Sequence, residues 1–219
     1  MRNALLLLLI GVGQIAMVVS YPRAAWLLAW SGLSFCAVAV AYALQRPRVF
    51  GKRIDGTMGW GWGVLLLPYL LLTWLFWYCQ TRFSREAVHN EVAPGLWIGR
   101  RAGVKELPPG VTMIVDLTSE FGEPRAVRAG RTYLCLPTLD NAVPAPEAFR
   151  SAVRETAPCT GVVYIHCALG HGRSALVAAA ILTARGLAAS PEEALARVEG
   201  ARPGVRLDRE QWVFLKKWS

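Results

Sequence analysis

One nine-residue segment in the last third of the chain combines a nucleophile with groups that bind anions. Four apolar residues, 162–165, lead into residues 166–174, which read His-Cys-Ala-Leu-Gly-His-Gly-Arg-Ser. A loop of the length between Cys167 and Arg173 can surround one tetrahedral oxyanion, because its successive backbone N–H groups can point into the same concavity. The pattern therefore predicts phosphoryl transfer to the sulfur of Cys167.

Cys167 is the predicted nucleophile of this loop. A free thiol is mostly protonated at neutral pH, and inward-pointing N–H groups at a helix N-terminus favour the thiolate that must attack phosphorus. Gly170 and Gly172 are expected to allow positive φ angles and close backbone approach, which inward-facing amides require. Arg173 offers a planar fork for two phosphate oxygens and should bind them more tightly in a trigonal bipyramidal transition state.

The other loop residues have supporting roles in this prediction. Ser174 is expected to donate its hydroxyl to the sulfur when a phosphocysteine is hydrolysed, and His166 to orient the loop through backbone hydrogen bonds rather than act as a base. Ala168, Leu169 and His171 complete the predicted phosphate-binding loop. The alternative, a buried cysteine beside an ordinary glycine turn, requires all these residue types to coincide by chance.

These residues resemble the signature loop of the cysteine-dependent protein tyrosine phosphatase superfamily, and more narrowly its dual-specificity branch. The resemblance runs from Glu91 to the end of the chain: residues 92–99 are similar to the opening strand of that branch and residues 111–117 to the strand that follows. It implies hydrolysis through a phosphocysteine intermediate, with no metal and no other cofactor. No stretch resembles the loop that recognises phosphotyrosine in the tyrosine-specific enzymes, which favours a shallower cleft.

The superfamily resemblance also implies a general acid on a loop before the nucleophile strand. Asp140, in the sequence Leu-Pro-Thr-Leu-Asp-Asn at 136–141, occupies the matching position. One carboxyl group there can protonate the departing oxygen and then, as a carboxylate, activate water. Asp116, Glu120 and Glu123 are other carboxylates that could reach the site, and Asp140 could instead be a turn-forming residue.

Two details of the loops concern the substrate. His171 stands where phosphoinositide 3-phosphatases of the tensin-homologue type have a lysine, and Ala168 replaces their other loop lysine, which argues against a highly charged inositol polyphosphate. Residues 119–124, Ser-Glu-Phe-Gly-Glu-Pro, resemble the Glu-Glu-Tyr-Glu loop of the mitochondrial phosphatidylglycerophosphate phosphatases. The alternative for this segment is a plain acidic turn in which Pro124 opens a helix.

The N-terminal part of the chain contains three apolar stretches of roughly membrane-spanning length, at 4–19, 24–44 and 61–79. Tryptophans lie near the ends of these stretches, as interfacial anchors do: Trp26, Trp30, Trp60, Trp62, Trp74 and Trp77. We predict a membrane domain over residues 1–83 with three transmembrane helices, and a catalytic domain over residues 84–219. The chain would then be a multi-pass membrane protein of a membrane-anchored bacterial type, in the cell inner membrane if bacterial.

Two features leave details of this membrane domain open. The first stretch could be a signal sequence, but no small-x-small cleavage site precedes Tyr21, which favours an uncleaved span. Pro68 could make the third stretch re-entrant.

Positive charge is concentrated beside the apolar stretches. Residues 1–83 hold seven Lys or Arg and one acid, a net charge of +6, whereas the rest holds 17 basic and 14 acidic residues, a net charge of +3. Basic flanks attract anionic lipid headgroups, and the soluble part has no basic stripe interleaved with aromatics that would indicate nucleic-acid binding.

The side of the membrane on which the catalytic domain lies is not determined by these charges. The positive-inside rule, applied to the basic cluster at 46–53, places the catalytic domain outside if the third stretch spans. Basic residues at 82–101 and a reactive thiolate instead favour a reducing compartment. Both alternatives stay open.

The remainder of the chain alternates strand and helix patterns. Strands are predicted at 96–99, 112–117, 132–136 and 162–167, and helices at 146–156, 174–185, 191–200 and 208–218. Ser190 before Pro191 is a typical helix N-cap. We predict an α/β fold: a dual-specificity-phosphatase-like, mainly parallel sheet flanked by helices and preceded by transmembrane helices.

Together these patterns predict a phosphomonoester hydrolase acting on a phosphorylated lipid at the membrane, because tethering raises the effective concentration of a membrane substrate. The alternative is a dual-specificity protein phosphatase acting on phosphotyrosine or phosphoserine/threonine of a phosphoprotein. A catalytically silent phosphate-binding membrane module would need neither Cys167 nor Asp140. A rhodanese-like sulfurtransferase would not need Arg173 followed by Ser174.

Overall fold

A computed structural model describes residues 2–218, which form two compact units. The first unit comprises the chain up to Arg53 together with Met58–Ser84. The second comprises the short segment Ile54–Thr57 and the chain from Arg85 onward. The catalytic residues predicted from the sequence all lie in the second unit.

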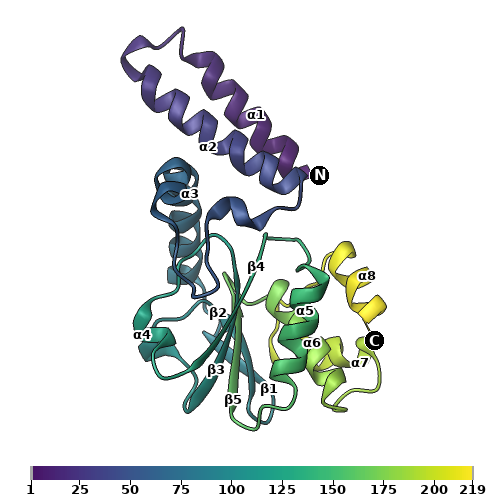
Figure 1. Cartoon of the computed structure of the whole chain (residues 1–219). Helices are drawn as coiled ribbons and strands as arrows, with labels where there is room; N and C mark the ends of the chain where they lie inside the picture. The colour runs from purple at the N-terminus through teal and green to yellow at the C-terminus, as the bar shows by residue number, and fades with distance from the viewer. Residues whose placement is uncertain (1, 219) are drawn as a thin grey trace. The chain divides into compact units, whose positions relative to one another are not determined.

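The first unit is built from three helices, α1 (Arg2–Met17), α2 (Ala25–Ala43) and α3 (Trp60–Phe83), with 3-10 turns at Pro22–Ala24 and Pro47–Phe50 (Figure 1). α1 and α2 pack closely where Gly11 faces Gly32. A Cβ atom on either glycine would lie 2.8 Å from the carbonyl oxygen of the other, so a larger residue would force the helices apart. The indole N–H of Trp30 donates to the carbonyl of Val64 at 3.1 Å and joins α2 to α3.

Within the described residues, two helices are long and apolar enough to cross a membrane. They are Pro22–Ala43, with a mean hydropathy of 1.8, and Trp60–Phe83, with a mean hydropathy of 1.6. The first predicted stretch forms α1, which has 16 residues and is therefore shorter than the 18 residues taken here as the minimum for a candidate membrane span. Large apolar side chains on α1 and α3 are exposed, among them Leu9 and Phe76, and such surface is unfavourable in water.

The second unit is organised around a five-stranded sheet in the order β1-β2-β5-β3-β4. The strands are β1 (His89–Ala93), β2 (Leu96–Arg100), β3 (Val111–Thr118), β4 (Thr132–Thr138) and β5 (Val162–Cys167). β1 is antiparallel to β2, and the other three pairings are parallel. The predicted mainly parallel sheet of an α/β fold is therefore confirmed.

Helices cover both faces of this sheet (Figure 1). One face packs against α5 (Pro146–Thr156), α6 (Arg173–Ala184), α7 (Pro191–Ala201) and α8 (Arg209–Trp218), and the other against the short α4 (Arg125–Arg128). Because side chains alternate along a strand, Ile165 and Cys167 of β5 join the core under the four helices, whereas Tyr164 joins the core beside Val127 of α4.

Two local features can be compared with the sequence-based expectations. Residues 92–99 do not form one opening strand, because Pro94 and Gly95 make a turn between β1 and β2 in which Gly95 has φ +72° and its N–H donates to Glu91 at 2.8 Å. The helix at Pro191–Ala201 begins as predicted, with Ser190 accepting a hydrogen bond from the N–H of Glu193 at 3.2 Å.

Candidate active site

The nucleophile predicted from the sequence lies at the carboxyl end of β5, directly before the loop that leads into α6. Cys167 is the last residue of the strand and is 4% exposed. The N–H of Gly170 donates to its Sγ atom at 3.2 Å, and the hydroxyl of Ser174 lies 3.6 Å from the same atom. Since α6 begins at Arg173, the positive end of the helix dipole also faces this sulfur.

The two glycines of the loop have different structural roles. Gly170 has φ +82°, and a Cβ atom there would lie 2.3 Å from the carbonyl carbon of Gly99, so only glycine can occupy this position. The positive φ predicted for Gly172 is wrong, because its φ is −90°. Glycine at residue 172 instead allows the close approach of Gln211, because a Cβ atom at this position would lie 3.1 Å from the Oε1 atom of that side chain.

Arg173 is buried and is held on one side by a carboxylate. Its two terminal nitrogens donate to the two carboxylate oxygens of Glu120 at 3.1 and 2.8 Å, and Nη1 also donates to the carbonyl of Thr138 at 2.8 Å. Burial by itself lowers the pKa of Arg173, but the Glu120 and Asp140 carboxylates outweigh this effect and hold it above its usual value. Burial likewise raises the pKa of Glu120, and the Arg173 guanidinium outweighs it and keeps this pKa low. The pair is therefore ionised and fixed in orientation before any ligand binds.

Asp140 lies close to this arginine on the loop after β4. Its Oδ1 atom is 3.3 Å from Nη2 of Arg173, and its side chain is 61% exposed. The loop is held from behind by Gln211, whose Nε2 donates to the carbonyl of Ala142 at 3.1 Å. Asn141 has φ +55°, a conformation that asparagine tolerates better than most residues. The structure thus brings a solvent-accessible carboxyl group to the phosphate loop.

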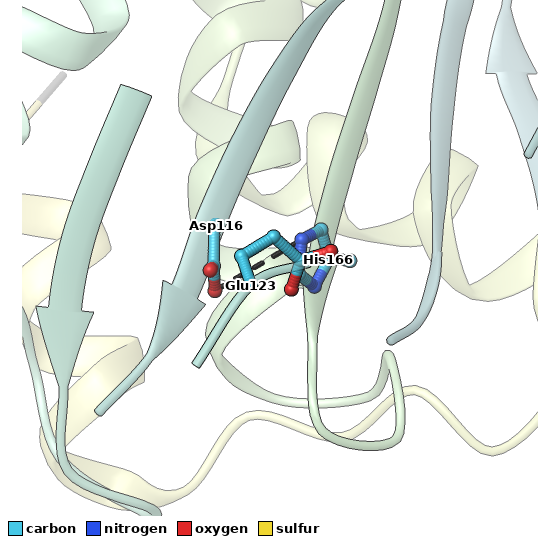
Figure 2. Close-up of side chains that lie close together, drawn as sticks. All are labelled: Asp116, Glu123 and His166. Carbon is cyan, nitrogen blue, oxygen red and sulfur yellow. Dashed lines mark ion pairs between the residues drawn. The ribbon is translucent and has the colours of Figure 1, made fainter. Parts of the chain in front are cut away.

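The other three carboxylates considered as general acids lie elsewhere or are engaged. Glu120 is the buried partner of Arg173. Asp116 and Glu123 lie beside His166 (Figure 2). His166 and Cys167 are consecutive residues of β5, so their side chains point to opposite faces of the sheet. This placement favours Asp140 over Asp116, Glu120 and Glu123 as the acid.

Asp116, Glu123 and His166 form a buried cluster whose ligand atoms all lie within 4.8 Å of one another, a grouping that could bind a cation (Figure 2). The carboxylate of Asp116 already accepts hydrogen bonds from the N–H and hydroxyl of Thr118 at 2.8 and 2.7 Å, and from the hydroxyl of Tyr133 at 2.6 Å. His166 Nε2 lies 3.9 Å from Asp116 Oδ1. These contacts link β5, which carries the nucleophile, to β3 through Asp116, and link β3 in turn to β4 through Tyr133.

The acidic loop 119–124 is anchored by several contacts within the second unit. Glu123 pairs with Arg101 at 3.3 Å, and its N–H donates to the carbonyl of Gly56 at 2.8 Å. Gly56 has φ +79°, and a Cβ atom there would lie 2.5 Å from the hydroxyl oxygen of Tyr133. Pro124 precedes the four-residue helix α4, so a helix does begin at the end of this loop, as the alternative interpretation of residues 119–124 expected. The same loop also carries Glu120, which binds Arg173.

The back of the phosphate loop is held by residues distant in the sequence. The carbonyls of Leu169 and Gly170 accept hydrogen bonds from Arg202 at 3.0 and 2.9 Å, so this arginine supports the loop backbone. The carbonyl of Ala168 accepts from the N–H of Arg101 at 3.2 Å. Nε2 of His171 lies 2.8 Å from Oε2 of Glu86, a contact that no local pattern in the sequence indicates.

Comparison with known proteins gives structural relatives. No protein-family model matches this chain, and no curated protein matches it. Among solved structures, Tk-PTP in its active form is 28% identical with a TM-score of 0.53, covering 60% of this chain and 95% of that chain. A single-residue variant of human DUSP28 is 26% identical with a TM-score of 0.52, covering 59% of this chain and 92% of that chain. PTPMT1 in complex with PI(5)P is 22% identical with a TM-score of 0.53, covering 60% of this chain and 94% of that chain.

These matches cover nearly the whole of each relative and about three-fifths of this chain. In the strand-to-helix loop of this chain, the Gly170 N–H and the Ser174 hydroxyl both approach the sulfur of Cys167. The chain therefore has a dual-specificity-phosphatase-like fold, and its structural relatives support its placement in the cysteine-based protein tyrosine phosphatase superfamily.

Proposed function

We propose that this chain is a phosphomonoester hydrolase that works through a phosphocysteine intermediate on a phosphorylated lipid at a membrane. The observation that carries the chemistry is the arrangement around Cys167. Its sulfur lies within reach of the Gly170 N–H and the Ser174 hydroxyl, and the loop ends in an arginine whose orientation Glu120 fixes. An anion bound there meets a nucleophile and a preorganised cation together.

In the first step, the thiolate of Cys167 attacks phosphorus. The new P–S bond forms while the bond from phosphorus to the substrate oxygen breaks, and Asp140 gives its proton to that departing oxygen. Arg173 stabilises the charge on the equatorial oxygens, because its fork is already aligned by Glu120 and costs no reorganisation. The product of this step is a phosphocysteine and a free alcohol.

In the second step, water releases the phosphoryl group. Asp140, now a carboxylate, takes a proton from the water whose oxygen attacks phosphorus, and the P–S bond breaks to return the thiolate. The hydroxyl of Ser174, 3.6 Å from the sulfur, can donate a hydrogen bond to the leaving thiolate. Inorganic phosphate leaves and the enzyme is restored.

A lipid substrate is supported by the apolar helices that precede the catalytic unit. Pro22–Ala43 and Trp60–Phe83 are candidate membrane spans, and a membrane-bound catalyst meets lipid headgroups at high effective concentration. One structural relative, PTPMT1, is described in complex with PI(5)P, a phosphorylated lipid. The membrane domain over residues 1–83 and the catalytic domain over 84–219 are part of this proposal.

The proposal is tested by trapping the intermediate and by comparing substrates. Full-length protein in detergent is mixed with a ³²P-labelled phosphomonoester and quenched in acid, and an acid-stable phosphoprotein is expected with the label on Cys167. Initial rates on phosphatidylglycerophosphate, phosphoinositides and phosphopeptides are then compared in the same preparation. A clear preference for phosphopeptides would establish the protein phosphatase alternative, and absence of any labelled protein would overturn the proposed chemistry.

Asp140→Asn should slow the first chemical step by about 10²-fold or more for substrates whose leaving group is an alkoxide. The loss should be much smaller for p-nitrophenyl phosphate, because p-nitrophenolate leaves without needing a proton. Pre-steady-state bursts with both substrates measure this difference. Glu147→Gln, on an exposed residue of α5, serves as the control, and an Asp140→Asn rate equal to wild type on the alkyl substrate would assign the acid role to another group.

A further inference from the structure

The chain between the apolar helices α2 and α3 turns back on itself over residues 51–59. Lys52 and Met58 form an antiparallel bridge within the first unit. The segment Ile54–Thr57, which lies between them in the sequence, belongs to the second unit by its contacts. We call it the inserted segment. The catalytic unit is therefore completed by a short stretch of chain, both ends of which continue into the first unit.

The inserted segment contacts the acidic loop 119–124 through Gly56. The carbonyl of Gly56 accepts a hydrogen bond from the N–H of Glu123 at 2.8 Å. The φ angle of Gly56 is +79°, and a Cβ atom there would lie 2.5 Å from the hydroxyl oxygen of Tyr133. A side chain at this position would be strained and would force the segment away from its neighbours. Glycine thus allows a contact that holds one end of the acidic loop.

The other end of the acidic loop holds the guanidinium of Arg173. Glu120, three residues before Glu123, accepts hydrogen bonds from both terminal nitrogens of this arginine at 3.1 and 2.8 Å. Phe121 lies between the two glutamates and is buried, which leaves the backbone there little freedom to absorb a movement. A displacement of Glu123 is therefore passed along the loop to Glu120 and to the arginine.

Arg101 connects the acidic loop to the phosphate loop by a second route. Its side chain donates to the carbonyl of Gly122 at 2.9 Å and pairs with Glu123 at 3.3 Å. Its backbone N–H donates to the carbonyl of Ala168 at 3.2 Å. The residue next to the nucleophile and the residue that contacts the inserted segment are thus linked through one arginine.

We propose that Gly56 is a positioning residue for the reaction. Through it, the inserted segment holds the acidic loop so that Glu120 presents Arg173 to the transferring phosphoryl group. This inference rests on the proposed function. Donors that are aligned in advance stabilise the transition state without reorganisation, so a loosened Glu120 should slow the chemical step more than it weakens substrate binding.

Gly56→Ala in the full-length protein in detergent tests this role. The rate of phosphocysteine formation from p-nitrophenyl phosphate, measured as the pre-steady-state burst, should fall about tenfold, because small misplacements of catalytic groups are costly. The substrate affinity obtained from the same burst should change by less than about twofold. The burst amplitude should equal that of the wild type. Amplitude separates positioning from stability, since a variant that only unfolds loses active sites while the remaining ones react at the normal rate.

Gly186→Ala is the matched control. Gly186 lies shortly after α6 with φ +67°, so alanine there has the same backbone strain. In the described chain, however, a Cβ atom at this position would have no atom within 4 Å beyond its immediate chain neighbours. The burst rate of this variant should stay within about twofold of the wild type.

Asp55→Ala provides a second variant that keeps the test available if Gly56→Ala does not fold. The carboxylate of Asp55 accepts hydrogen bonds from the N–H and the hydroxyl of Thr57 at 2.9 and 2.7 Å and so shapes the turn around Gly56. Its removal loosens the inserted segment without adding an atom. The burst rate should fall about threefold at unchanged amplitude.

Amide hydrogen exchange gives a measurement of the acidic loop that does not depend on turnover. The N–H of Glu123 is protected by its bond to Gly56. Peptides covering residues 119–124 should therefore exchange about tenfold faster in Gly56→Ala than in the wild type. Vanadate, which can adopt the five-coordinate geometry of the transition state, should bind about fivefold more weakly because Arg173 is less well aligned.

An unchanged burst rate in the Gly56 and Asp55 variants would overturn the inference even if the loop exchanged faster, because Arg173 would then not depend on the inserted segment. A loss of burst amplitude alone would also overturn it and leave residue 56 with a structural role. Failure of the wild-type chain to form a phosphocysteine would instead contradict the proposed function. Hydrogen exchange and vanadate affinity would then still decide whether the inserted segment positions the arginine.

Discussion

Replacing Cys167 with serine should reduce turnover of every phosphomonoester by about 10⁴-fold or more, because a serine hydroxyl in this loop has no adjacent base to ionise it. Binding of vanadate or inorganic phosphate should persist, since the loop amides and Arg173 remain. The measurement is the initial rate with p-nitrophenyl phosphate together with the affinity for phosphate, both in the full-length protein.

Cys159→Ser is the matched control, because Cys159 is a partly buried cysteine before β5 whose Sγ atom lies 4.0 Å from the carbonyl oxygen of Gly161. It should retain turnover within about twofold. A Cys167→Ser enzyme with wild-type rates would show that the sulfur above which the loop closes is not the nucleophile.

Arg173→Lys should lower kcat/KM by about 10²–10³-fold, the usual loss when a donor to a developing oxyanion is removed. A lysine ammonium is a point charge and cannot contact both oxygens of Glu120 while it holds two phosphate oxygens. Most of the loss should appear in kcat, because the arginine binds the transition state more strongly than the ground state. Steady-state kinetics with p-nitrophenyl phosphate measure this partition.

Arg197→Lys is the control for this substitution, since Arg197 is an exposed residue of α7 paired only with Glu193 four residues before it in the described structure. Its kinetics should match the wild type. Retention of full activity by Arg173→Lys would contradict the oxyanion geometry on which the mechanism depends. Circular dichroism and thermal unfolding distinguish lost catalysis from a lost fold.

Much of the fold was predictable from local patterns. The apolar runs at 112–117 and 162–167 form buried parallel strands, and the four predicted helices after residue 145 are present with ends that agree to within one residue. The strand predicted at 96–99 is β2, but its antiparallel partner β1 was not predicted as a separate strand, because residues 89–93 have little apolar periodicity of their own. The short α4 was considered only as an alternative, since four residues carry little helical periodicity.

The phosphate loop itself could be predicted from the sequence because its chemistry is local. The nucleophile, the glycine with φ +82° and the arginine lie within seven consecutive residues between a strand and a helix. Such a segment needs only its own backbone to form an anion-binding cradle, so the order of its residues already specifies the arrangement.

The order of residues thus determined the reaction centre and the succession of strands and helices. The tertiary structure alone decided which distant side chains complete the site: Glu120 is 53 positions from Arg173, and Glu86 is 85 positions from His171. These pairs meet because parallel pairing sets β3 beside β5 and because α7 ends against the phosphate loop. No periodic pattern records such contacts, since a carboxylate on a loop has the same local sequence whether it faces solvent or a buried arginine.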